Sequence, residues 1–183
     1  MAQERTSWQI KDEAILTELV TMMEISSAEC ALLGQLKGQA EVLAPEMTKA
    51  FYGRLFQHTN TAEYLEGISM DRLNSMLATW FIELFNGVYD EDYARRRINI
   101  GRIHVRIGLP LRYPLAMMDV IMVFGEQVAH QSDQPDVAMT AFRKALALDV
   151  AIFNQAYEDN QMKHLADLVG GERLARLLLS GAG

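Results

Sequence analysis

The residues with the clearest potential for chemistry surround His104, in the stretch RRRINIGRIHVRIGLP at residues 95–110. A buried imidazole needs a partner for each ring nitrogen, and a glycine inside a helix costs about 1 kcal/mol relative to alanine. Both costs need a physical reason. If this stretch is a helix, His104 shares its stripe with Arg97, Ile100, Gly101, Ile107 and Gly108.

Two interpretations of His104 are open from spacing alone. A lone histidine on an apolar face is more often a hydrogen-bonded core residue than a ligand. The glycines on either side favour a ligand, because missing side chains let a broad, flat molecule approach the backbone. Iron held by one axial imidazole in a porphyrin is such a molecule. The other three histidines, His58, His130 and His164, have structural explanations at helix ends or in a polar stretch.

A flat apolar ligand also needs apolar walls. Aromatic and aliphatic residues recur at helical spacing in two segments that precede His104, although such a stripe is usually ordinary core. The candidate wall residues are Phe51, Phe56, Met76, Leu77, Trp80 and Phe81.

Composition restricts the class of protein. The chain has 183 residues, half of them hydrophobic, which predicts one domain with a sizeable core. A net charge of -7 argues against broad contact with nucleic acid or an anionic membrane surface. The single cysteine, Cys30, excludes an internal disulfide, and no run approaches the roughly 18 apolar residues of a membrane span. We therefore expect a cytoplasmic protein.

The elements that must position these residues are predicted to be helices throughout. Apolar residues recur at intervals of three and four, and no Asn-Gly hairpin joins two alternating strands. Segment 59–68 is predicted to be a loop or a short, distorted helix, and a Gly-Gly break precedes a short leucine-rich tail. Caps, prolines and glycines predict helices from Ser26 to about Val42, over 45–58, from Ser69 or Asp71 to Gly87, from Asp90 to Gly108, over 114–130, and from Asp136 to about Asp167.

Three segments together resemble a known family. RINIGRIHVRIGLPLRYPLAM, preceded by KAFYGRLFQH and DRLNSMLATWFIELFNG, closely resembles the sensor globins of globin-coupled sensors and their relatives the protoglobins. The resemblance covers roughly residues 25–165. It implies an all-α globin fold with an N-terminal extension and with the D helix absent or vestigial. In it, 45–58 is the B helix, the third helix is E, the His104 helix is F, and the last two are G and H.

The resemblance also implies the site. His104 would be the proximal ligand of the iron of heme b, and Gly101 and Gly108 would leave room for the porphyrin. Tyr52 falls where the family keeps a tyrosine that hydrogen-bonds bound oxygen or organises a distal water. A buried structural tyrosine whose hydroxyl is satisfied elsewhere is the alternative. The expected cofactor-binding residues are His104, Tyr52, Phe51, Leu73, Met76, Leu77, Trp80, Ile100, Gly101 and Ile107.

Met76 departs from the family pattern, because several members have a small hydroxyl residue at this position. Its loss leaves Tyr52 as the main polar contact for a ligand. The Met76 thioether is also a candidate sixth ligand, although methionines in helices are mostly core filler. Arg95, Arg96, Arg97, Arg102 and Arg106 are candidate partners of the heme propionates.

The function that the resemblance implies is reversible binding of O2, and also of CO and NO, by the gas-sensing domain of a signal transducer. Ligand state would pass through a homodimer interface of the G and H helices to a fused output domain, such as a diguanylate cyclase. We expect an N-terminal extension at 1–24, the heme domain at 25–167 and a linker at 168–183, with no enzymatic activity in this domain itself. The alternatives are a single-domain heme globin with redox, peroxidase-like or NO-scavenging activity, and a cofactor-free helical signalling module.

Overall fold

The computed structural model describes residue 10 and residues 13–179, and the regular elements among these residues are helices, with no strand. The predicted all-α fold is confirmed. None of the described helices is long and apolar enough to cross a membrane. The elements in chain order are α1 (Glu13–Met23), α2 (Ser27–Gln35), α3 (Lys37–Phe56), α4 (Thr59–Ala62), the 3-10 turn η2 (Glu63–Leu65), α5 (Met70–Glu83), α6 (Glu91–Arg106), α7 (Arg112–Ala116), α8 (Met118–Ala129), α9 (Pro135–Val169) and α10 (Glu172–Leu179).

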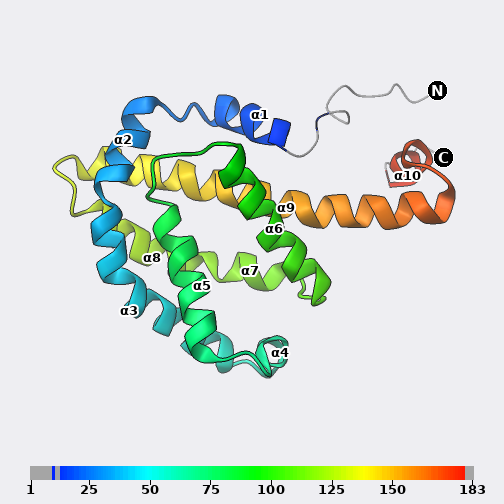
Figure 1. The fold of residues 1–183 in the computed structure, drawn as a ribbon, viewed down its shortest axis with the longest axis horizontal. Helices are drawn as coiled ribbons and strands as arrows, with labels where there is room; N and C mark the ends of the chain where they lie inside the picture. Colours follow the sequence, from blue (N-terminus) through cyan, green and yellow to red (C-terminus); the bar gives the residue numbers. More distant parts are fainter. Residues whose placement is uncertain (1–9, 11–12, 180–183) are drawn as a thin grey trace.

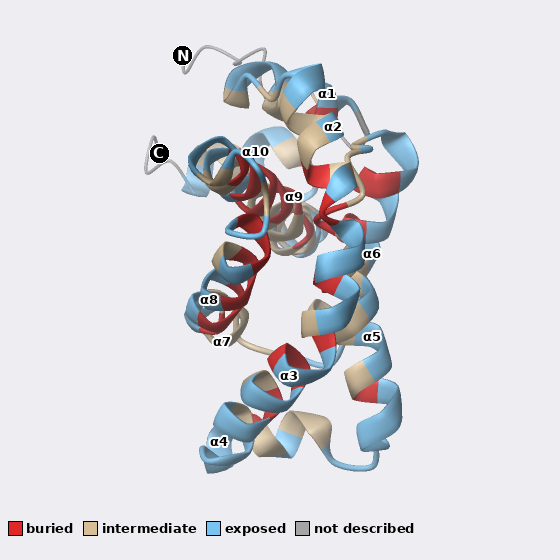
Figure 2. Ribbon diagram, turned by 90° about the vertical axis from the view of Figure 1, so that its left-hand side faces the viewer, coloured by how far each residue is buried: buried red, intermediate tan, exposed pale blue. Residues whose placement is uncertain are grey.

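Five other helices pack against the long helix α9. It contacts α1, α2, α6, α8 and α10, while α3 contacts both α5 and α8 (Figure 1). Its 35 residues span about 52 Å at 1.5 Å per residue. Figure 2 shows the buried residues concentrated along α8 and α9 and on the inward sides of their neighbours.

The core has two parts. The larger part lies among α2, α3, α5, α8 and α9 and includes Leu33, Met47, Phe81 and Phe142. The smaller part lies among α1, α6 and α9 and includes Tyr93 and the residues packed on it. Both parts lie against α9, so this helix fixes the positions of α5 and α6 relative to each other.

Helix starts follow local sequence signals closely. Ser26 and Glu29 form the predicted capping box of α2, and Ser69 caps α5 by accepting from the backbone N–H of Arg72. Asp90 caps α6 by accepting from the N–H of Tyr93 at 2.9 Å. The predicted distorted segment at 59–68 is the pair α4 and η2. The predicted end of the last helix is confirmed by Gly170, which has a left-handed φ of 84°.

Two predicted helix boundaries are wrong. The break expected between Val42 and Pro45 lies instead at Leu36, and α3 runs through Pro45. Proline removes one helical N–H, but Glu41, whose carbonyl loses that donor, is exposed to water. The third helix ends at Glu83 rather than at Gly87.

The helix predicted over 114–130 is divided at Met117 into α7 and α8. The N–H of Met117 is shared between the carbonyls of Tyr113 and Pro114, both at 3.2 Å. Such shared, tightened hydrogen bonds are typical of helix ends. The division places α7 beside the cavity described below.

The chain ends pack against the body of the fold. Helix α1 contacts α6 and α9, and α10 folds back onto α9 after the Gly-Gly turn at 170–171 (Figure 1). Of the expected extension at 1–24, residues 1–9, 11 and 12 lie outside the described residues, as do residues 180–183 of the expected linker.

Candidate functional site

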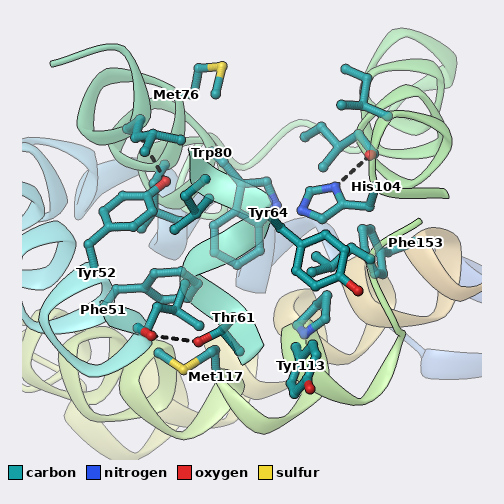
Figure 3. A pocket seen from close by; sticks show the side chains of 18 of the residues that line it. Phe51, Tyr52, Thr61, Tyr64, Met76, Trp80, His104, Tyr113, Met117 and Phe153 are labelled. Atoms are coloured by element: carbon teal, nitrogen blue, oxygen red, sulfur yellow. Dashed lines mark hydrogen bonds between the residues drawn. The ribbon is translucent and has the colours of Figure 1, made fainter. Parts of the chain in front are cut away.

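A cavity of about 290 Å³ lies among α3, η2, α5, α6, α7 and α9 (Figure 3). Its walls are mostly aliphatic and aromatic. Nine of the ten predicted site residues line it, namely Phe51, Tyr52, Leu73, Met76, Leu77, Trp80, Ile100, His104 and Ile107. The helices α3, α5 and α6 therefore bring together residues that are up to 56 positions apart in the sequence.

His104 presents one free ring nitrogen to this cavity. Its Nδ1 lies 2.8 Å from the carbonyl oxygen of Ile100, one turn earlier on α6, and donates to it. In Figure 3 the other nitrogen, Nε2, points into the cavity. The ring also packs edge-on against Phe153 of α9, with centroids 5.2 Å apart. The sequence did not identify the acceptor for Nδ1, and the structure supplies it from the same helix.

Electrostatics keep this imidazole neutral. Burial lowers the pKa of His104 below its ordinary value of 6.5, and the hydrogen bond to Ile100 offsets only part of that effect. A neutral imidazole that donates from Nδ1 carries its lone pair on Nε2. This is the form in which histidine coordinates a metal.

Gly101 does not line the cavity, and its expected role as room for a flat ligand is wrong. A Cβ at Gly101 would lie 2.6 Å from the Cβ of Ala156 and 2.9 Å from the carbonyl oxygen of Phe153. The missing side chain therefore lets α6 pack closely on α9. Gly108 has open space around it and a φ of 71°, so it ends α6 in the left-handed conformation that glycine favours.

Tyr52 faces the cavity from the wall opposite His104 (Figure 3). Its hydroxyl donates to the carbonyl oxygen of Leu73 at 3.1 Å, so in this state it has the structural partner that the alternative interpretation requires. Burial raises the pKa of Tyr52 to about 12, and the phenol therefore stays protonated and can donate at neutral pH. Donation to a bound ligand would require this hydroxyl to leave Leu73.

Three other wall candidates differ in their exposure and in their relation to the cavity. Met76 is 49% exposed, and in Figure 3 its side chain points away from His104, which disfavours the thioether as a sixth ligand. Phe81 is fully buried in the larger core, and Phe56 is 46% exposed; neither lines the cavity. The aromatic stripe thus divides between core and cavity.

A buried polar cluster behind the cavity was not predicted from the sequence. Asp149 of α9, which is 3% exposed, accepts from Trp80 Nε1 at 2.9 Å and from the Tyr93 hydroxyl at 2.6 Å. Arg97 of α6, which is 1% exposed, donates to the same carboxylate and to Glu83 of α5. Arg97 is therefore committed to the protein interior and is not a propionate partner.

This cluster connects the elements that carry the cavity. Trp80 lines the cavity from α5, Asp149 lines it from α9, and Arg97 lies on α6 two turns before His104. One feature of the sequence could have indicated this buried cluster, because Asp149 is a charged residue within the otherwise apolar run ALALDVAIF. The orientation of the Trp80 ring is set by its bond to Asp149.

Among the residues that the structure describes, no group of three or more His, Cys, Asp or Glu side chains could hold a bare metal ion.

A family model described as Protoglobin matches residues 12–163. The chain belongs to the protoglobin family. Membership of this globin family implies a heme cofactor, which brings its own four nitrogen ligands and needs only an axial one.

Two further comparisons find that this chain is similar to sensor proteins. It is 25% identical over 171 residues to the heme-based aerotactic transducer HemAT of Halobacterium salinarum, covering 85% of this chain. The chain spans about a third of that relative, 35% of its length. It also matches the globin domain of the Geobacter sulfurreducens globin-coupled sensor with a TM-score of 0.72 and 27% identity, over 77% of this chain and 96% of that one.

The residues of the cavity fit a heme. Its walls are apolar, as a porphyrin face requires, and the Nε2 of His104 is an available axial ligand. Ile100, Ile103 and Ile107 line the cavity on the same helix.

Proposed function

We propose that this protoglobin binds heme b in the cavity between α5 and α6, with His104 Nε2 as the axial ligand of the iron. The observation that carries the proposal is the neutral imidazole that faces an apolar cavity with Nδ1 already bonded to Ile100. The chain's one cysteine, Cys30, lies on α2 and does not line the cavity. This supports noncovalent heme b rather than a heme attached through thioether bonds.

The heme, when bound, supplies reversible binding of O2, CO and NO, and the protein tunes that binding. Tyr52 is the donor we assign to bound O2, because its protonated hydroxyl faces His104 across the cavity. Two states of this hydroxyl then exist, one bonded to Leu73 and one to the ligand. The first state is the one observed here.

The domain acts in sensing. One relative is a heme-based aerotactic transducer, and one similar structure is the globin domain of a globin-coupled sensor. The carboxylate of Asp149, the acidic group lining the cavity, is fully engaged by Trp80, Tyr93 and Arg97. It is not placed as a general acid or base, which favours a sensor over a peroxidase-like enzyme.

Ligand state would leave the domain through a homodimer of α8 and α9. Met122 and Val123 of α8 and Val137 of α9 are exposed apolar side chains, as a dimer interface requires. Since the chain spans a third of its transducer relative, a fused output domain is part of this proposal. The interface can relay a signal only if the two ligand states make different contacts across it.

Oxygen dissociation from the ferrous protein tests the role of Tyr52. A Tyr52→Phe substitution removes the donor and keeps the ring, so O2 dissociation measured by stopped flow should accelerate about five- to tenfold, as expected for the loss of one hydrogen bond. CO accepts weakly and its dissociation should change less than twofold. Equal effects on both gases would assign Tyr52 the structural role instead.

A further inference from the structure

Most polar groups that line the cavity are already bonded within the protein. The Tyr52 hydroxyl donates to Leu73, and the Thr61 hydroxyl donates to the carbonyls of Leu55 and His58. Trp80 and Asp149 bond each other. Two lining hydroxyls have no main-chain or carboxylate acceptor among the described residues, those of Tyr64 and Tyr113.

These two tyrosines come from different elements and meet at one side of the cavity. Tyr64 is on η2 and Tyr113 on α7, with ring centroids 6.4 Å apart. In Figure 3 both rings lie below His104. Their position is separate from the Tyr52 wall and from the buried cluster of Arg97 and Asp149.

A cation accompanies this pair. The Arg112 guanidinium lies over the Tyr113 ring, 4.6 Å from its centroid, and its Nη2 donates to the Tyr113 hydroxyl at 3.2 Å. The hydroxyl thus receives a bond from Arg112 and keeps its own proton for an acceptor. Arg112 is exposed, so part of its hydrogen-bonding capacity is also available.

We infer that Arg112, Tyr113 and Tyr64 form a carboxylate-binding site at the edge of the cavity, and that it holds a propionate group of the heme. A guanidinium and a phenol that donates are a suitable pair for a carboxylate. The chain carries a net charge of -7, so a bound dianion needs a local cation, and the more buried Arg97 is already paired. This inference rests on the proposed binding of heme.

Hemin and its dimethyl ester distinguish the carboxylate contacts from the rest of the binding site. The apoprotein is titrated with each compound, for the unchanged chain and for Arg112→Gln and Tyr113→Phe, with far-UV circular dichroism to confirm folding. We expect Arg112→Gln to weaken hemin binding about five- to tenfold, as for an exposed charge-assisted bond, and to change ester binding less than twofold. Tyr113→Phe should act in the same direction.

Arg143→Gln is the matched control, because Arg143 is an exposed arginine on α9 that pairs with Glu126 and does not line the cavity. It should bind both compounds like the unchanged chain. Equal hemin affinity in Arg112→Gln and the control would overturn the carboxylate site while leaving heme binding intact, and so would an equal loss for hemin and ester. Failure of the unchanged chain to bind either compound would overturn the proposed function itself.

Discussion

Replacing Asp149 should destabilise the fold more than any exposed charge would. Its side chain is 4% exposed and that of Arg97 is 1% exposed, so water screens this pair little. Asp149→Ala leaves three donors without their acceptor, namely Arg97 Nε, Trp80 Nε1 and the Tyr93 hydroxyl. Removing one partner of a buried ion pair costs about 3–5 kcal/mol. We therefore expect a loss of about 4 kcal/mol in the free energy of unfolding.

Guanidinium unfolding of the apoprotein, followed by far-UV circular dichroism, measures this loss. For a domain of this size it corresponds to a decrease in Tm of roughly 8–16 °C. Asp92→Ala is the control, because Asp92 pairs with Arg95 at the surface, where both side chains are more than half exposed. That pair should contribute less than about 1 kcal/mol. Equal stability of the two variants would refute a structural role for the buried cluster.

Three further predictions concern Glu29, Gly101 and Met76. Although burial would raise the pKa of Glu29, its bonds to Lys144 and Ser26 lower that pKa below the ordinary 4.5. Folding therefore favours the charged form of Glu29. The stability that this carboxylate contributes is present above pH 4.5 and is lost as the pH falls through the pKa of the folded state. Glu29→Gln removes this contribution and should flatten that part of a curve of stability against pH. Gly101→Ala forces a Cβ against Ala156 and should lower the free energy of unfolding by about 1–3 kcal/mol. Gly53 has open space around it, so Gly53→Ala should instead stabilise α3 by about 0.5–1 kcal/mol. Equal effects of the two substitutions in thermal unfolding would contradict the close packing of α6 on α9. Met76→Leu should leave the ferric absorption spectrum unchanged, since the side chain points away from His104; a changed spectrum would reinstate the thioether as a ligand.

The sequence predicts those features of the fold whose causes are local. Ser26, Ser69 and Asp90 begin helices because each side chain accepts from the backbone N–H three residues later. The wrong prediction at Pro45 has a tertiary cause. Ala44 and Met47 on either side of it are buried in the core, and this packing keeps α3 continuous through the proline.

Site residues could be predicted from the sequence only where they lie on one helix or in a motif of the family. His104 and the isoleucines share one helix, so their spacing already places them on a common wall. Gly101 was misinterpreted because spacing does not show what lies opposite a glycine, and α9 lies there rather than the cavity. Arg97 and Asp149 are 52 residues apart, so no local pattern could reveal that they meet.

The central claim is that His104 holds a heme iron in this cavity. The most direct measurement is the absorption spectrum of the purified protein, ferric and then dithionite-reduced, with and without CO, beside a His104→Ala variant. We predict an intense Soret band that shifts on reduction and on CO binding, and that is lost or altered in the variant. A colourless protein that takes up no added hemin, or a variant with an unchanged spectrum, would contradict the account.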